Sequence, residues 1–184
     1  MTNSFTSKLP LLSEPLQGVK VMLRPFQKTD IGPTYLGWLN DPDVVRFSNQ
    51  RLRRHTLESS LQYLSSFKDS DNHFLAICDR DSHSMVGTLT VYHNIHHGTA
   101  DIGIMVGHVD SWGKGVGQDA FRTVVLALES GMVRKITAGT LALNVGMVRI
   151  LQKVGFECEA TRKGQELLDG RPVDLLYFAK FCHA

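Results

Sequence analysis

The sequence predicts a single α+β domain with a central, mostly antiparallel mixed sheet and flanking helices. Three observations support this fold class. Strand-like apolar runs fill positions 73 to 106, a strongly helical run follows them, and two further strand-like runs flank Asp169-Gly170. No internal repeat or linker separates these regions. We therefore expect residues 1–18 to form an N-terminal tail or lead-in, and residues 19–184 to form one domain.

The first half of the domain is predicted to contain one strand, two helices and a meander. Residues 19–24 alternate and end at Pro25, as a first strand would. Asp30 to Asn40 has the apolar residues of a helix, and Thr56 is a suitable N-cap for a second helix. The remaining strands are predicted at 73–78, 85–92 and 99–106.

The second half begins with a glycine-rich segment, Gly113 to Gly117, that leads into a helical run. Gly155 is a suitable C-terminal cap for a later helix, and Asp169-Gly170 is typical of a tight hairpin turn. The other elements expected here are a strand at 133–143, a helix at 144–153 and hairpin strands at 157–168 and 172–181.

The composition narrows the class of protein. The chain has 184 residues, with 42% hydrophobic and 21% charged residues, which is ordinary for a soluble domain with one core. Its formal net charge of +2 is too small to indicate nucleic-acid binding, and no apolar run is long enough to cross a membrane. Cys78, Cys158 and Cys182 form no CxxC pair, and no signal-peptide pattern precedes them. We expect a reduced, cytoplasmic protein without nucleic-acid or membrane partners.

The glycine-rich segment has the properties of an anion site. The first turn of a helix leaves backbone N–H groups without partners, and glycines let the backbone approach phosphate oxygens closely. Two nucleotide loops fail on spacing. Gly107 is one residue too far from Gly113-Lys114 for a P-loop, and G-x-G-x-G differs from the dinucleotide-binding G-x-G-x-x-G. For the loop alone, a flexible strand–helix turn remains the alternative.

The residues around this loop carry a stronger signal. They are Ala100-Asp101-Ile102-Gly103-Ile104-Met105-Val106, then Trp112-Gly113-Lys114-Gly115-Val116-Gly117-Gln118-Asp119-Ala120, and later Asn144 to Lys153 with Val154-Gly155-Phe156. In this order they resemble the acetyl-CoA-binding and N-x10-G-F motifs of the GNAT N-acetyltransferase superfamily. Leu23-Arg24-Pro25 and Glu166-Leu167-Leu168-Asp169-Gly170 are similar to the branch that includes ribosomal-protein N-terminal acetyltransferases and spermidine acetyltransferase. The resemblance covers about residues 19 to 181.

The resemblance implies that acetyl-CoA is the donor. Its pantetheine arm would pair with exposed backbone groups of Ile104, Met105 and Val106. Asn144 matches the motif asparagine near that arm, and it is equally suited to be a helix N-cap. Trp112 replaces the family's usual Arg or Gln, which matters little because backbone groups do the binding. The pyrophosphate would accept hydrogen bonds from Gly113, Lys114, Gly115, Val116, Gly117 and Gln118.

Direct transfer to an amine needs a base, because a protonated amine has no lone pair with which to attack. Asp101 matches the position of a glutamate base in many family members. Glu166 matches the base of the ribosomal-acetyltransferase branch, so we place it first. Either carboxylate is alternatively a surface residue of a strand. The positions of the family's general acids hold Leu151 and Met147, which cannot donate a proton, and Tyr177 is a further candidate.

The acceptor is expected between the first two helices and the last hairpin. Trp38-Leu39-Asn40-Asp41-Pro42 resembles a segment of several members that acylate amino sugars, which makes Trp38 and Asn40 candidate substrate-binding residues. Arg46, with its neighbours Arg51, Arg53 and Arg54, could hold a carboxylate or phosphate, although such runs are more often solvated. His93, His96, His97 and His108 lack metal-ligand spacing, so we expect no metal.

Several alternatives stay open at this point. The acceptor is a small-molecule or peptide amine: an amino sugar, a polyamine, another small amine or a protein N-terminus. Whether the chain forms a homodimer is also open. The main alternative function is a catalytically weak acyl-CoA-binding or regulatory protein, because Leu151 and Met147 replace the acid. A nucleic-acid-binding module built on residues 46–54 is a second alternative, which the modest net charge disfavours.

Overall fold

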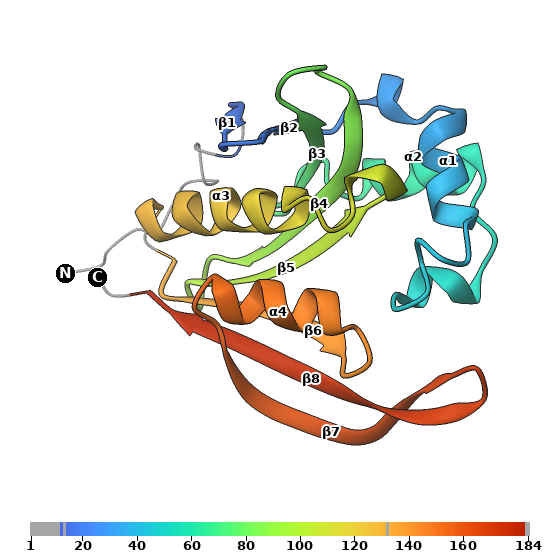
Figure 1. Ribbon diagram of the computed structural model, residues 1–184. Helices are drawn as coiled ribbons and strands as arrows, with labels where there is room; N and C mark the ends of the chain where they lie inside the picture. Colours follow the sequence, from blue (N-terminus) through green and yellow to red (C-terminus); the bar gives the residue numbers. More distant parts are fainter. Residues whose placement is uncertain (1–11, 13, 132, 183–184) are drawn as a thin grey trace.

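The computed structural model of the chain describes residues 12, 14–131 and 133–182. Within these ranges the chain forms an eight-stranded sheet with the order β1-β2-β3-β4-β5-β6-β8-β7. Neighbouring strands are antiparallel, except that β5 and β6 run parallel. This mixed sheet with flanking helices confirms the predicted α+β fold class (Figure 1).

The bounds of the elements are close to those expected from the sequence. The strands are β1 Leu16–Gln17, β2 Val21–Pro25, β3 His73–Asp79, β4 Met85–Asn94, β5 Thr99–Val106, β6 Lys135–Leu141, β7 Glu157–Leu168 and β8 Arg171–Phe181. The helices are α1 Pro33–Asn40, α2 Leu57–Ser65, α3 Val116–Ser130 and α4 Val145–Lys153, with short 3-10 turns η2 Lys28–Asp30, η3 Asn49–Leu52 and η4 Val109–Ser111. Of the helices in the described part of the chain, none combines the length and apolar character needed to cross a membrane.

Helices cover both faces of the sheet. Figure 1 shows α3 and α4 side by side in front of the sheet, with α1 and α2 grouped together away from them. On β3, Leu75 and Ile77 pack in the core cluster that contains α3, whereas Phe74, Ala76 and Cys78 pack in the cluster that contains α1 and α2. Because β3 is covered on both faces, its sequence is a continuous apolar run without alternation.

The sheet begins earlier than the sequence suggested. Residues up to 18 were expected to be a tail or lead-in, but Leu16 and Gln17 pair with β2; residues 1–11 and 13 lie outside the described ranges. The Asp119 carboxylate in the first turns of α3 accepts hydrogen bonds from three consecutive N–H groups. They belong to Val19, Lys20 and Val21, at 3.2, 2.7 and 3.1 Å. This contact anchors the N-terminal edge of the sheet to α3.

The first helix starts later than expected, at Pro33 rather than Asp30. The Asp30 carboxylate is engaged by two hydrogen bonds from the Arg24 guanidinium, both 2.8 Å, and by one from the Gln27 backbone. Pro33 then occupies the first helical position, where its missing N–H has no cost. The second helix is capped as predicted, because the Thr56 hydroxyl accepts from the Ser59 N–H at 3.2 Å.

The last hairpin is bent toward the segment before α2. Its turn is of the predicted kind, since Asp169 and Gly170 both have positive φ, 51° and 74°. Two register shifts in β7, at Cys158/Ala160 and at Arg162/Glu166, interrupt the strand. Such bulges bend a strand and break up an exposed edge. The hairpin tip thereby contacts the segment before η3, where Phe47 packs against Leu141, Leu168 and Val173.

Candidate functional site

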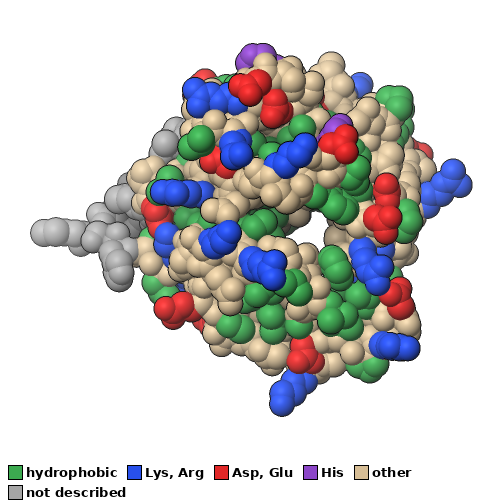
Figure 2. Space-filling model, viewed as in Figure 1, with side chains coloured by type: hydrophobic (Ala, Val, Ile, Leu, Met, Phe, Trp, Pro, Cys, Tyr) green, Lys and Arg blue, Asp and Glu red, His purple; other side chains and the backbone are tan. Residues whose placement is uncertain are grey.

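The sheet splits between β5 and β6. The two strands pair with each other only over 99–101 and 135–137. Beyond these residues β5 continues to Val106 paired only with β4, and β6 continues to Leu141 paired only with β8. Figure 2 shows an opening through the middle of the molecule, between the part that carries β4 and β5 and the part that carries α4 and the last hairpin. A gap of this kind exposes backbone N–H and C=O groups on both strands, which can pair with an extended ligand.

The backbone of β5 alternates between β4 and the gap. On the β6 side, the Gly98 carbonyl accepts a hydrogen bond from the Arg134 N–H at 2.9 Å. On the β4 side, the Gly107 N–H donates to the Val86 carbonyl at 2.9 Å. Even-numbered residues therefore direct their backbone groups toward β6 or the gap, and odd-numbered ones toward β4. Ile104 and Val106 face the gap as expected. Met105 does not, because its backbone groups are directed at its register partner in β4.

One of the two gap-facing residues already has a protein partner. The Trp112 indole Nε1–H donates to the Val106 carbonyl oxygen at 2.7 Å, although 46% of the Trp112 surface is exposed. The side chain at the position where the family usually has Arg or Gln thus fastens the loop to the end of β5. The N–H and C=O of Ile104 are left as the principal backbone groups for a ligand in the gap.

The glycine-rich segment presents a continuous row of N–H groups. Gly113 and Gly115 have positive φ, 72° and 81°, and Gly115 is the N-cap of α3. The first N–H bonded within the helix is that of Asp119, which donates to the Gly115 carbonyl at 2.9 Å. No acceptor from the described part of the protein contacts the preceding N–H groups, those of Gly113, Lys114, Gly115, Val116, Gly117 and Gln118. With the dipole of α3, this arrangement is suited to bind an anion.

Close packing positions this segment next to the gap. A Cβ on Gly117 would lie 3.2 Å from Val106 Cγ2 and 3.3 Å from Ile150 Cδ1, so glycine lets α3 approach both β5 and α4. Asn144, which ends the loop after β6, caps α4: its Oδ1 accepts from the Met147 N–H at 3.2 Å. The N-cap role of Asn144 is therefore present in the structure.

Asp101 lies where β5 and β6 separate. It belongs to the last paired position of β5, and its Oδ2 is 2.6 Å from the hydroxyl of its partner Thr137. Its side chain extends from the face opposite to Ile102, which is buried against α3. Although water reaches the residue, the surrounding protein raises the pKa of the Asp101 carboxyl by desolvation, and the hydrogen bond with Thr137 opposes this rise. Such a carboxylate is suited to accept a proton.

Two tyrosines extend the polar surface next to Asp101. Tyr92 is the direct cross-strand partner of Asp101, and its hydroxyl lies 2.8 Å from that of Tyr63 on α2. Burial, helped by this hydrogen bond, raises the pKa of Tyr63. Neither tyrosine nor Thr137 was predicted, because only strand pairing and helix packing bring these residues to Asp101.

Glu166 lies far from Asp101. Asp101 is level with Thr137 of β6, and Leu141 lies four residues further along that strand. Leu141 pairs with Leu175 of β8, and Val173, the partner of Glu166, lies two residues further in the same direction. Glu166 and Asp101 are thus separated by about six residues along the strands. Six residues along a strand correspond to roughly 20 Å, so the two carboxylates cannot serve the same nitrogen atom.

The Glu166 carboxylate also has protein partners. The Asn49 amide donates to Oε1 at 3.2 Å, and an Arg51 nitrogen lies 3.6 Å from Oε2. Arg51 donates to the Leu167 carbonyl at 2.9 Å as well. These contacts attach the hairpin to η3.

The two positions that the resemblance assigns to a general acid lie in apolar surroundings. Leu151 is fully buried, and Met147 packs on the same core cluster. Tyr177 lies on the other face, where its ring covers Gly139 of β6. The structure therefore places no proton donor at the positions of Leu151 and Met147.

Trp38 and Asn40 have structural contacts in place of the expected substrate contacts. Trp38 is 8% exposed, and a Cβ on Gly107 would lie 2.1 Å from its ring atom Cδ2, so the indole packs directly on the backbone after β5. The Asn40 amide donates to the Leu36 and His55 carbonyls, at 2.8 and 2.9 Å, and accepts from the His55 N–H at 2.9 Å. We therefore correct the assignment of both residues to the fold.

Replacing Trp38 by alanine is expected to destabilise the protein by about 3–5 kcal/mol, the usual cost of removing a buried tryptophan. Urea unfolding followed by circular dichroism would measure this change, with Trp38→Phe as the milder control. A loss below 1 kcal/mol together with a large rise in KM for the acceptor would restore Trp38 to the substrate site.

The basic segment before α2 is partly neutralised by the hairpin. Arg46 forms an ion pair with Asp169 at 3.2 Å, while Arg51 pairs with Glu166. Arg46 is thus joined to the hairpin turn by one exposed ion pair, and its role toward a substrate stays a prediction. Nowhere in the described ranges do three or more His, Cys, Asp or Glu side chains gather in a metal-binding arrangement.

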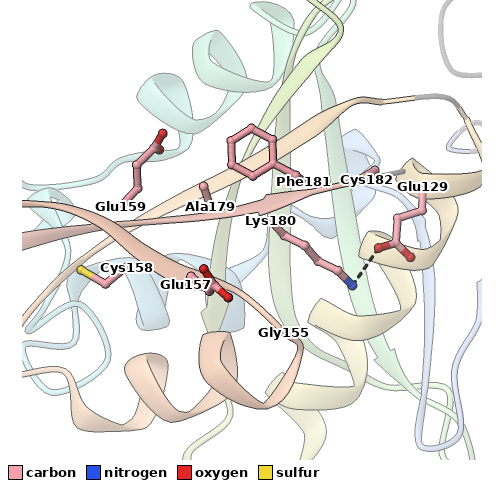
Figure 3. A pocket seen from close by; sticks show the side chains of 9 residues that line it. All are labelled: Glu129, Gly155, Glu157, Cys158, Glu159, Ala179, Lys180, Phe181 and Cys182. Atoms are coloured by element: carbon pink, nitrogen blue, oxygen red, sulfur yellow. Dashed lines mark ion pairs between the residues drawn. The ribbon is translucent and has the colours of Figure 1, made fainter. Parts of the chain in front are cut away.

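A second depression is lined by residues from the end of α3, the turn after α4, the start of β7 and the end of β8. Figure 3 shows its lining side chains, with Lys180 directed at Glu129 across the pocket; their ion pair measures 2.7 Å. Cys158 and Cys182 lie at separate ends of the pocket, and both thiols are free. Its lining includes no residue of the glycine-rich segment or of β5, so this pocket is distinct from the gap.

Comparisons with known proteins agree with this geometry. A family model described as the acetyltransferase (GNAT) domain matches residues 20–157. The protein named "Probable N-acetyltransferase YjcK" from Bacillus subtilis (strain 168) is 27% identical over 165 residues, which cover 84% of this chain and 90% of that protein. The uncharacterized protein MJ1062 from Methanocaldococcus jannaschii is 21% identical over 147 residues, but the match spans only 30% of that protein.

Solved structures show the same fold. Ribosomal-protein-S5-alanine acetyltransferase from Vibrio fischeri has a TM-score of 0.77 and 15% identity, covering 92% of this chain and 97% of that one. RimL, a ribosomal L7/L12 alpha-N-protein acetyltransferase solved with coenzyme A, has a TM-score of 0.77 and 14% identity, covering 91% and 98%. The match to the family model extends over most of the chain, from β2 through α4, and the chain therefore belongs to the GNAT acetyltransferase family.

Proposed function

We propose that this protein transfers an acetyl group from acetyl-CoA directly to a primary amine. The observation that carries the proposal is the position of the β5–β6 gap beside the row of N–H groups at 113–118. Those N–H groups would bind the pyrophosphate. The backbone of Ile104 would pair with the pantetheine arm, which runs from the loop toward Asp101. The RimL structure with coenzyme A has the same fold, which supports a donor of this kind.

Asp101 is the residue we propose as the general base. Its raised pKa makes it a better proton acceptor than an ordinary aspartate, and Thr137 holds one of its oxygens. The first N–H that faces the gap beyond the paired residues is that of Ile104, three residues and about 10 Å along the strand. A bridging water would therefore carry the proton to Asp101. The Ile104 N–H would donate to the oxyanion that forms on the thioester carbonyl.

The proposed transfer needs no acyl-enzyme. The amine nitrogen attacks the thioester carbon, its proton passes to Asp101, and the carbon–sulfur bond breaks to release the coenzyme thiolate. Leu151 and Met147 cannot protonate this thiolate, so it takes a proton from solvent. The acceptor amine would enter from the face that carries Asp101, opposite α3 and α4.

The test is release of free thiol from acetyl-CoA in the presence of a panel of amino sugars, polyamines, small amines and N-terminal peptides. We expect amine-dependent release with at least one acceptor, and mass spectrometry should find the acetylated amine. Calorimetry with acetyl-CoA measures donor binding independently of turnover. Binding without turnover on any amine would instead assign the protein to the acyl-CoA-binding or regulatory class.

A further inference from the structure

We propose that the acceptor is an amine that also carries a carboxylate or a phosphate, and that the Arg162 guanidinium binds this anionic group. The inference rests on the proposed function, because it concerns the acceptor side of the same site. Three observations support it: the placement of Arg162 relative to Asp101, its contact with Tyr177, and the free state of its charge.

The strand register places Arg162 and Asp101 on the same face of the sheet. Asp101 is level with Thr137 of β6, and Leu141, four residues further along β6, pairs with Leu175 of β8. Leu175 in turn pairs with Arg162 of β7. Register partners share a face, as do residues an even number apart. Arg162 therefore extends from the same face as Asp101, on the edge strand β7, with β8 and β6 between it and the gap.

The Arg162 side chain reaches back toward Asp101. Its guanidinium carbon lies 4.9 Å from the centroid of the Tyr177 ring. Tyr177 pairs with Gly139, two residues beyond Thr137 in β6. The guanidinium is thus about two residues, or roughly 7 Å, further along the sheet than Asp101, with a lateral offset across β6 and β8. A molecule of moderate length can contact both groups.

The charge of Arg162 is available to a ligand. In the described part of the chain, Arg162 makes neither an ion pair nor a side-chain hydrogen bond, whereas Arg46 and Arg51 are paired with Asp169 and Glu166. Stacking on Tyr177 holds the guanidinium while leaving its N–H edge free. That edge matches the geometry of a carboxylate or a phosphate, which it can bind with two parallel hydrogen bonds.

The opposite wall of the acceptor face carries a second available cation. Arg53 donates a hydrogen bond to the Gln50 side chain at 3.2 Å but has no carboxylate partner in the described ranges. Its positive charge acts on Tyr63, where it opposes the rise that burial causes in the pKa of that phenol. Tyr63 is bonded to Tyr92, the neighbour of Asp101. The acceptor face therefore has cations without carboxylate partners on both sides of Asp101, whereas two other carboxylates on this face, Glu159 and Glu166, are paired with Lys135 and Arg51. This distribution of charge favours an amine with an anionic group over a polyamine.

Matched acceptor pairs test this inference directly. One pair is 6-aminohexanoate and 6-aminohexanamide, and the other is 4-aminobutyl phosphate and 4-aminobutanol. Thiol release at saturating acetyl-CoA should give kcat/KM about tenfold higher for the anionic member of at least one pair, the factor typical of one charge-assisted hydrogen bond. The pair with the larger ratio distinguishes a carboxylate from a phosphate.

Arg162→Gln should reduce the ratio of kcat/KM for the anionic acceptor to kcat/KM for its neutral partner to about one. The change should come from KM for the anionic acceptor rather than from kcat, and kcat/KM for the neutral acceptors should stay the same. Arg162→Lys should keep part of the preference. Arg171→Gln is the matched control, since it removes the same charge from the same hairpin about 13 Å further from Asp101. Its ratio should equal that of the wild type. Neutral acceptors used as well as anionic ones in both pairs, or an Arg162→Gln ratio unchanged from the wild type, would overturn the inference.

A binding measurement separates this inference from the proposed function. In the coenzyme A complex, the ¹⁵N–¹H signal of Arg162 Nε, assigned by its loss in Arg162→Gln, is followed during titration with each of the four acceptors. Only the anionic acceptors should shift it. If no amine releases thiol but this shift occurs, the anion site stands and the transferase fails. If no anionic acceptor shifts the signal, the anion site is refuted whatever the turnover.

Discussion

Replacing Asp101 by asparagine is expected to lower kcat for amine acetylation at neutral pH by about 10²- to 10⁴-fold, the range contributed by a positioned general base. Asparagine has nearly the same shape and keeps an oxygen for Thr137, so the pairing of β5 with β6 needs no change. The amide cannot take up a proton. Steady-state thiol release gives kcat, and calorimetry should find the Kd for acetyl-CoA unchanged, because the glycine-rich segment is intact.

The pH profile gives this prediction a second readout. The wild-type rate should rise with pH through the pKa of Asp101, which desolvation raises above its usual value against the effect of Thr137. In the variant this acidic rise should be absent, leaving only the rise above about pH 8 that reflects the acceptor amine.

Although Asp101→Asn should lower activity, it should leave the stability of the folded protein at pH 7 equal or higher. The folded pKa of Asp101 is raised above the unfolded value, so its contribution to stability is fully present below the unfolded pKa and is lost as pH rises through the folded pKa. Asp101→Asn should therefore unfold at an equal or higher urea concentration than the wild type at pH 7. A variant that is inactive because it is unfolded would show the reverse.

Glu166→Gln is the comparison that decides between the two carboxylates. Glutamine keeps an oxygen for Asn49, and the hairpin retains its Phe47 contacts, so we expect kcat to fall by less than about threefold, far below the effect of removing a base. If Glu166→Gln loses more activity than Asp101→Asn, the assignment of the base must be reversed.

The elements that the sequence predicted well depend on residues close together in the chain. The Thr56 cap, the Asp169-Gly170 turn and the Asn144 cap are each set by side chains within three residues of one another. The glycine-rich segment belongs to this class, because a helix N-terminus preceded by left-handed glycines exposes its N–H groups wherever the helix packs.

The features that the sequence could not give depend on register and on distant packing. Met105 was expected to face the gap, and only the pairing with β4 shows which residues of β5 do so. Trp38 was assigned to the substrate because its motif is found in amino-sugar acylases, but a motif cannot show that the indole rests on Gly107. In the same way, Thr137 and Asp101 are 36 residues apart and meet only across two strands.

Gly87→Ala is expected to destabilise the protein by about 3 kcal/mol, at the upper end of the cost of overpacking. Gly87 is the register partner of Val106 at the end of β5. A Cβ at this position would lie 2.3 Å from the Met105 carbonyl oxygen and 3.0 Å from Val106 Cα. These are backbone atoms that cannot rotate away, so β4 and β5 must separate where β5 leads into the glycine-rich segment. Urea unfolding would measure the loss.

Gly37→Ala is the matched control, because a Cβ there has no neighbour within 4 Å and Gly37 lies inside α1. It should stabilise the protein by about 0.5–1 kcal/mol through helix propensity. Equal stabilities of the two variants would contradict the close approach of β4 to β5. Gly87 has no side chain that could contact a ligand, so any effect of the alanine on ligand binding must come from the separation of β4 and β5. A weaker Kd for acetyl-CoA in folded Gly87→Ala would therefore show that the spacing of β4 and β5 sets the gap-facing backbone of Ile104.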